Sequence, residues 1–133
     1  MAEIPIEAAS RRPVIDHVGV LVRDLAASTH FYAAALAPLG MTLLYEESDG
    51  AAFGFEGADD FGIHWNEAPT ASVHVAFAAQ DRASVDAFCA AALANGGREK
   101  GAPRIWAEYH AGYYAAFVWD PDGNNIEAVF HDR

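Results

Sequence analysis

The feature of this sequence that most constrains its fold is an internal repeat. When the second half is laid over the first with a shift of 57 residues, eleven of the twenty-four positions from residue 17 to residue 40 are identical. Five of the identities are alanines, but the others fall at different structural roles in one register. They include His17 on His74, Asp24 on Asp81, Phe31 on Phe88, Leu36 on Leu93 and Gly40 on Gly97. Two copies predict one duplicated supersecondary unit rather than a long array.

The first copy has the pattern of a strand, a helix and three more strands. β-Branched residues alternate with others over residues 14–22, which predicts a strand. Asp24 is suited to cap a helix over about 25–39, and Gly40 is suited to end it. Turn-forming residues then separate three predicted strands, at residues 41–46, 51–55 and 61–66.

The second copy repeats this order. A strand is predicted at 72–79, followed by a helix that Asp81 caps and that ends at Asn95-Gly96-Gly97. Residues 98–109 contain Gly101 and Pro103 and are predicted to be irregular, with a short strand and a long loop. The chain closes with a strand at 113–119, a tight turn at 120–125 and a strand at 126–130.

Composition narrows the class of protein. The net charge is −11 and the eight basic residues are scattered, which argues against nucleic acid or an anionic membrane as partner. The single cysteine rules out an intrachain disulfide framework. The chain shows no signal-peptide pattern and no apolar run of about 20 residues, so we expect a cytoplasmic protein.

Glu127 is the first candidate functional residue, because it stands in the middle of an otherwise apolar strand. Burying a carboxylate there is costly without a positive partner. The repeat supplies candidates, since His17 and His74 occupy equivalent positions that pseudo-twofold pairing would bring together. His64 and Glu127 lie on the last strands of their copies and are predicted to be counterparts. A lone histidine of this kind is usually structural, but imidazoles with a carboxylate suit a divalent transition metal.

The motifs in combination resemble the vicinal oxygen chelate superfamily, which includes glyoxalase I, extradiol dioxygenases and fosfomycin- and bleomycin-resistance proteins. The resemblance extends from Val14 to Phe130. It rests on the two histidine-bearing strands, on Asp24-Leu25-x-x-Ser28-x-x-Phe31-Tyr32, and on Asp120-Pro121-Asp122-Gly123-x-x-Ile126-Glu127.

The resemblance implies an α+β fold in which two tandem βαβββ modules form a curved mixed sheet around a central cavity. The modules are expected at about 14–68 and 71–131 of a single domain, 14–133, after an N-terminal arm at 1–13. It also implies a homodimer. The implied metal ligands are His17, His74 and Glu127, with His64 where glyoxalase I is expected to carry Glu. The metal would be Fe, Zn, Ni, Mn or Co.

The expected function is that of a glyoxalase-like metal-dependent enzyme. A small molecule would chelate the metal through vicinal oxygens, and the enzyme would stabilise an enolate in a lyase or isomerase reaction, with Glu127 or a neighbouring side chain as the proton-transfer group. The alternatives are an extradiol-type dioxygenase and a metal-free protein that sequesters a small molecule. Substrate contacts are expected from a polar and aromatic segment that either packs or lines a pocket mouth: Arg104, Tyr109, His110, Tyr113 and Tyr114.

Overall fold

Each copy of the repeat folds into a βαβββ module in the computed structural model, which describes residues 14–132. The predicted arm at 1–13 lies outside the described residues. Module one consists of β1 (Val18–Val22), α1 (Leu25–Leu36), the 3-10 turn η1 (Ala37–Leu39), β2 (Thr42–Glu46), β3 (Gly50–Gly54) and β4 (Phe61–Trp65). Module two consists of β5 (His74–Ala78), α2 (Arg82–Ala94), β6 (Arg98–Ile105), β7 (Tyr113–Trp119) and β8 (Asn125–His131).

The strands of each module form one four-stranded mixed sheet. The strand orders are β1-β4-β3-β2 and β5-β8-β7-β6, so the two sheets have the same topology. In each sheet the first strand runs parallel to the last, and the remaining neighbours are antiparallel. The predicted α+β fold of two βαβββ modules is therefore confirmed.

Both helices begin at the predicted caps. The carboxylate of Asp24 accepts a hydrogen bond from the amide of Ala27 at 3.0 Å, and that of Asp81 accepts one from the amide of Ser84 at 2.7 Å. The first helix changes to a 3-10 turn three residues before its predicted end, where proline occupies position 38, and Gly40 ends it with a φ of +85°. No helix among residues 14–132 is long and apolar enough to cross a membrane.

One segment differs from the prediction. Residues 98–109 are predicted to be irregular, with a short strand and a long loop, but Arg98–Ile105 forms a strand of eight residues, β6, along β7. Its pairing shifts register between Glu99 and Gly101 and again between Gly101 and Arg104. Bulges of this kind accommodate glycine and proline, and β6 lies at the edge of its sheet, where a proline without an N–H is tolerated. The glycine and proline that predict a loop therefore lie within an edge strand.

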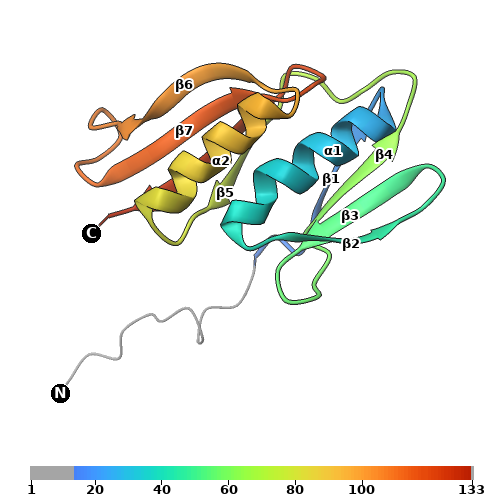
Figure 1. Ribbon diagram of the computed structural model, residues 1–133, viewed down its shortest axis with the longest axis horizontal. Helices are drawn as coiled ribbons and strands as arrows, with labels where there is room; N and C mark the ends of the chain where they lie inside the picture. Colours follow the sequence, from blue (N-terminus) through green and yellow to red (C-terminus); the bar gives the residue numbers. More distant parts are fainter. Residues whose placement is uncertain (1–13, 133) are drawn as a thin grey trace.

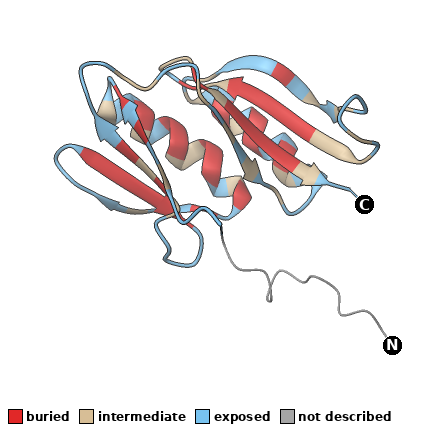
Figure 2. Cartoon of the chain, turned by 180° about the vertical axis from the view of Figure 1, so that it is seen from behind, coloured by how far each residue is buried: buried red, intermediate tan, exposed pale blue. Residues whose placement is uncertain are grey.

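The two helices lie side by side between the two sheets (Figure 1). The buried residues gather on the helices and on the strands β3, β7 and β8 (Figure 2). The ring of Tyr32 on α1 is 4.9 Å from that of Phe61 on β4, and Phe61 meets Phe77 on β5 edge to face at 5.3 Å. One hydrophobic core therefore joins both modules, and it leaves the opposite face of each sheet uncovered by helices.

The β7–β8 turn also ties the modules together. Asp120 is 2% exposed and accepts a hydrogen bond at 2.5 Å from the hydroxyl of Tyr32 in module one. Asn124 is equally buried. Its amide donates to the carbonyl of Thr70 at 2.9 Å and its side-chain oxygen accepts from the amide of Val73 at 3.2 Å. The turn thus fixes where β8 and its side chains lie relative to the rest of the chain.

Candidate metal centre

Glu127 lies on the face of the second sheet that points away from the helices, which we call the site face. In register, Glu127 pairs directly with Ala76 on β5 and with Phe117 on β7. Directly paired residues project to the same side of a sheet, whereas the neighbouring Ile126 and Ala128 pack in the core between the helices. The side chain of Glu127 is nevertheless 1% exposed, so its carboxylate is buried among the side chains of this face.

Two side chains satisfy that carboxylate, one on each oxygen. His74 Nε2 lies 2.7 Å from Glu127 Oε1, and the Tyr113 hydroxyl donates a short hydrogen bond to Oε2. Burial, together with the Glu127 carboxylate, raises the pKa of Tyr113 well above its ordinary value, so the hydroxyl stays protonated and remains a donor. The predicted pair of His74 and Glu127 is thus brought together, while His74 stays 51% exposed and accessible.

His17 and His64 lie on the other sheet. His17 directly precedes β1, is 69% exposed, and its Nδ1 lies 2.8 Å from Asp16 Oδ1. This hydrogen bond raises the pKa of His17 above 6.5. His17 and His64 both line a small cavity of about 200 Å³, and His17 also lines, with His74, a cleft of about 820 Å³ between β1 and β5. No group of three or more His, Cys, Asp or Glu side chains suited to a metal is present within residues 14–132.

The strand register corrects one interpretation of the repeat. Val18 pairs with Phe61 and the equivalent Val75 pairs with Ile126, so the residue after Phe61 corresponds to Glu127. The counterpart of Glu127 is therefore Gly62, and His64 lies two residues further along β4. His64 and Glu127 do lie on the last strands of their modules, but the backbone pairing puts their side chains in different rows. Module one carries no carboxylate at the position of Glu127.

Aromatic side chains surround Tyr113 on the site face. Trp106 packs edge to face on Phe117 at 4.9 Å and donates its indole N–H to the carbonyl of Ala115 at 2.8 Å. Tyr109 stacks on Trp106 at 6.4 Å and contacts Tyr113 at 4.9 Å. Of the residues expected to contact a substrate, Tyr109, His110 and Tyr113 are therefore brought into one cluster.

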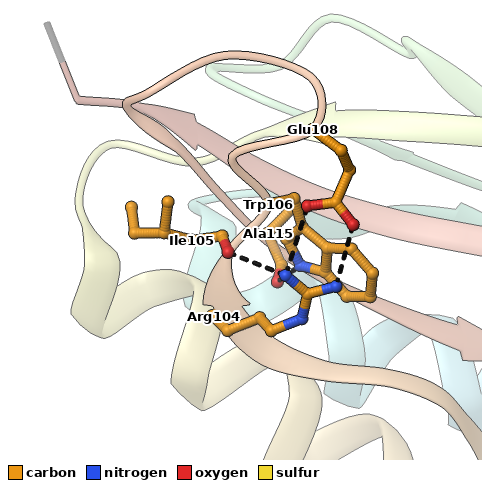
Figure 3. Close-up of polar contacts among 5 residues, drawn as sticks. All are labelled: Arg104, Ile105, Trp106, Glu108 and Ala115. Carbon is orange, nitrogen blue, oxygen red and sulfur yellow. Dashed lines mark hydrogen bonds and ion pairs between the residues drawn. The ribbon is translucent and has the colours of Figure 1, made fainter.

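Arg104 has its cationic group already engaged, as Figure 3 shows. The guanidinium lies 3.4 Å from the centre of the Trp106 ring and forms an ion pair with Glu108 at 3.1 Å. It also donates to the carbonyl of Ile105 at 2.9 Å. The Arg104 hydrogen bond lowers the pKa of Glu108, so the pair stays charged to acidic pH. In this arrangement Arg104 braces the loop after β6 rather than presenting a free cation.

Tyr114 lies on the helix side of the sheet, away from the site face. Phe117 and Lys100 lie on the site face and are not among the predicted site residues. The Tyr114 hydroxyl donates to Asp86 on α2 at 2.6 Å, so it belongs to the helix side of the sheet. Phe117 is the direct neighbour of Glu127, and the Lys100 ammonium lies 5.5 Å from the centre of its ring. Counting the strand pairs outward from the predicted turn at 120–125 would have identified Phe117, because antiparallel register follows from the turn.

Comparisons with known proteins identify the family and the fold. Residues 14–128 match the family model of the glyoxalase/bleomycin resistance protein/dioxygenase superfamily. A crystal structure of a glyoxalase/bleomycin resistance protein from Albidiferax ferrireducens T118 is 32% identical over 90% of this chain and 100% of that one, with a TM-score of 0.79. No curated protein sequence matches the chain.

Two further structures share the fold. A glyoxalase/bleomycin resistance protein/dioxygenase family enzyme from Burkholderia phytofirmans PsJN is 19% identical over 89% of this chain and 98% of that one, with a TM-score of 0.67. An E144Q mutant of glyoxalase I from Zea mays is 25% identical over 86% of this chain and 46% of that one, also with a TM-score of 0.67. With the family model covering nearly the whole described chain, this protein belongs to the glyoxalase/bleomycin resistance protein/dioxygenase superfamily.

Proposed function

We propose that this chain is a metal-dependent enzyme of the glyoxalase type, acting on a small molecule that presents two adjacent oxygens. The observation that carries the proposal is the convergence of His74 Nε2 and Glu127 Oε1 at 2.7 Å on the site face. Glu127 lies mid-strand, where a carboxylate is costly to bury, and the imidazole of His74 at the start of β5 is one of its two partners. Binding of a divalent cation accounts for both.

The residues fit such an ion. His74 Nε2 and Glu127 Oε1, which are 2.7 Å apart, would both be ligands of the ion. Imidazole nitrogen and carboxylate oxygen suit Zn, Ni, Co, Mn or Fe(II). Bound there, a divalent ion supplies Lewis-acid stabilisation of an enolate-like anion.

The protein side chains have separate roles in this proposal. His74 and Glu127 would hold the ion, and the ring of Phe117 beside Glu127 provides an apolar wall that excludes water from the carboxylate. Glu127 would accept a proton at Oε1 only when that oxygen does not hold the ion, because Oε2 already accepts the Tyr113 hydroxyl. Tyr109, at the exposed rim, is placed to contact the substrate.

We infer that His17 of a second copy completes the ligand set. Within one chain the described residues contain no cluster of three metal-binding groups, and His17 is exposed on the other sheet. A homodimer with twofold symmetry would place His17 of each copy against His74 and Glu127 of the other, forming two equivalent sites.

Metal loading tests the proposal directly. The purified full-length protein, stripped of metal, is titrated with Zn²⁺, Ni²⁺, Co²⁺ and Mn²⁺, and with Fe²⁺ under anaerobic conditions, by calorimetry and elemental analysis. We expect one tightly bound ion per chain, lost in His74→Ala and Glu127→Gln and retained in the control His30→Ala, whose histidine lies on α1. If none of the five ions binds stoichiometrically, the metal-dependent function is wrong.

A mixing experiment tests whether His17 and His74 of one metal site come from the same chain or from two copies. His17→Ala and His74→Ala are unfolded together and refolded as a mixture. If sites form between copies, half of the random dimers are mixed and each contains one intact site, so metal binding returns to roughly a quarter of the wild-type level. If both ligands come from the same chain, every site lacks one of them and no binding returns.

A metal-free binding protein is the second candidate, and one observation favours it. His74 and Glu127 already satisfy each other, and the cleft of about 820 Å³ between β1 and β5 is lined mainly by apolar residues. In that case the titrations show no binding, while an apolar fluorescent probe binds the cleft. Oxygen consumption with a catechol by the Fe²⁺-loaded protein would instead identify a dioxygenase.

A further inference from the structure

Tyr113 was expected to contact a substrate, but its hydroxyl is committed to Glu127. Among the described residues, the only side chain that donates to Glu127 Oε2 is Tyr113. Tyr113 lies at the start of β7 and is paired in register with His131. On the site face, one row, that of Ala115 and Val129, separates this pair from the row of Phe117 and Glu127. The Tyr113 side chain therefore reaches along the sheet, over the row of Ala115 and Val129, to meet the carboxylate.

Three rings hold the phenol in this position. Tyr109 contacts the Tyr113 ring at 4.9 Å, His110 meets it edge to face at 5.4 Å, and His131 meets it edge to face at 5.3 Å. The two imidazoles are themselves joined, with His110 Nε2 at 2.9 Å from His131 Nδ1. The amide of Gly112 donates to His110 Nδ1 at 3.0 Å, which connects the pair to the loop backbone. The hydroxyl is thus aimed by a packed cluster.

We propose that Tyr113 is a positioning residue that fixes the orientation of the Glu127 carboxylate. The hydroxyl of Tyr113 anchors Oε2, and the planar carboxylate then presents Oε1 toward His74. This inference rests on the proposed metal function for its consequence, because Oε1 and His74 Nε2 are the atoms that would hold the ion. Groups that orient metal ligands through hydrogen bonds contribute to affinity although they do not touch the metal.

Removing the hydroxyl releases this constraint. In Tyr113→Phe, Oε2 loses its donor in a buried site, and the carboxylate can rotate away from His74 to seek other partners. Loss of such an orienting hydrogen bond weakens metal binding by about 10- to 100-fold in comparable sites. Tyr114→Phe is the matched control, because it removes the same atom from the adjacent residue, whose hydroxyl bonds Asp86 on the opposite side of the sheet.

The test compares Co²⁺ binding and the visible absorption of bound Co²⁺ in wild type, Tyr113→Phe and Tyr114→Phe. Circular dichroism first checks that each variant is folded at the temperature used. We expect a Co²⁺ affinity about 10- to 100-fold lower and an altered Co²⁺ spectrum in Tyr113→Phe only. If Tyr113→Phe binds Co²⁺ with wild-type affinity and spectrum, Tyr113 does not position Glu127.

A second measurement separates failure of this inference from failure of the metal proposal. The nitrogen chemical shifts of the His74 ring are recorded by NMR in the metal-free proteins. If the wild type binds no metal but Tyr113→Phe alone shifts the His74 signal, the positioning role stands and the metal function falls. If neither variant shifts it, the Tyr113 hydroxyl has no hold on the pair, and the inference is overturned whatever the metal result.

Discussion

The hydrogen bond between Tyr32 and Asp120 offers the sharpest test of how the modules are joined. Tyr32 is fully buried on α1, and its hydroxyl donates to Asp120 Oδ2 at 2.5 Å across the module boundary. Tyr32→Phe removes only the hydroxyl, so the ring contact with Phe61 is retained. Burial, together with Asp120, raises the pKa of Tyr32 well above its ordinary value, so the donor is present throughout the physiological range.

The expected loss of stability depends on the hydrogen bonds that Asp120 retains in the variant. A hydrogen bond to a charged group contributes about 1.5–3 kcal/mol, and a buried acceptor that loses its partner costs a similar amount. Asp120 retains three donors, the amides of Asp122 and Asn124 at 2.9 and 2.8 Å and the Asn124 side chain at 3.1 Å. The loss should therefore lie in the lower half of that range, at about 2 kcal/mol, equivalent to roughly 6 °C in Tm for a chain of this length.

Urea unfolding of wild type, Tyr32→Phe and Tyr114→Phe supplies the measurement. Tyr114 donates to Asp86 at 2.6 Å near the surface, so its replacement should cost less than about 0.5 kcal/mol. We expect a single transition with an unchanged m-value for both variants, because the same surface is exposed on unfolding. Equal losses for the two variants would show that burial of the Tyr32–Asp120 bond adds nothing, and the reasoning would be refuted.

Three further predictions concern other parts of the chain. Gly101→Ala should destabilise the protein by about 1–3 kcal/mol in urea unfolding and alter Trp106 fluorescence, because the new Cβ would lie 2.8 Å from the indole; unchanged fluorescence would contradict it. The Ser84 hydrogen bonds lower the pKa of Asp81 below 3.8, so this carboxylate stabilises the fold above that pH and loses its effect as the pH falls through the folded pKa. The Tm of Asp81→Asn should accordingly fall less steeply with acid than that of wild type, and parallel curves would refute this. Since the pKa of Tyr113 is raised, its neutral form stabilises the folded chain until the pH rises through the folded pKa. In an ultraviolet titration above pH 10.0, phenolate should therefore form at a higher pH in the native chain than in the unfolded chain. The difference in pH should be smaller in Tyr113→Phe.

The module architecture could be predicted because the repeat fixed equivalent residues at several structural roles. A cap at Asp24 or Asp81 and the turn at 120–125 depend on local backbone chemistry, which a sequence displays directly. The full length of β6 could not be predicted, because its bulges at Gly101 break the alternation that marks a strand. The strand forms because its backbone pairs with β7, although its own sequence does not alternate.

Some residues of the candidate site could likewise be predicted from the sequence, and others could not. His74 and Glu127 belong to a predicted set that also includes His17 and His64, because Glu127 stands out within its strand and the repeat identifies the histidines. The roles of Tyr113 and Tyr114 depend on which face of β7 each occupies, and both faces carry aromatic and small residues. Arg104 illustrates a further limit, because its ion pair with Glu108 depends on how the loop after β6 folds back. The counterpart of Glu127 was misplaced because a shared strand does not fix the row, which depends on the backbone pairing.

The glycine at position 62 has a consequence for engineering this fold. A Cβ built at Gly62 would have as its nearest contact the Ala51 carbonyl at 3.9 Å, an ordinary van der Waals distance, and the residue lies in the row that Glu127 occupies in the other module. Module one thus has space for a Cβ at the position where module two carries its buried carboxylate. Gly62→Glu would therefore put an acidic residue at the equivalent position of the first sheet, with a Cβ that requires no shift of the backbone.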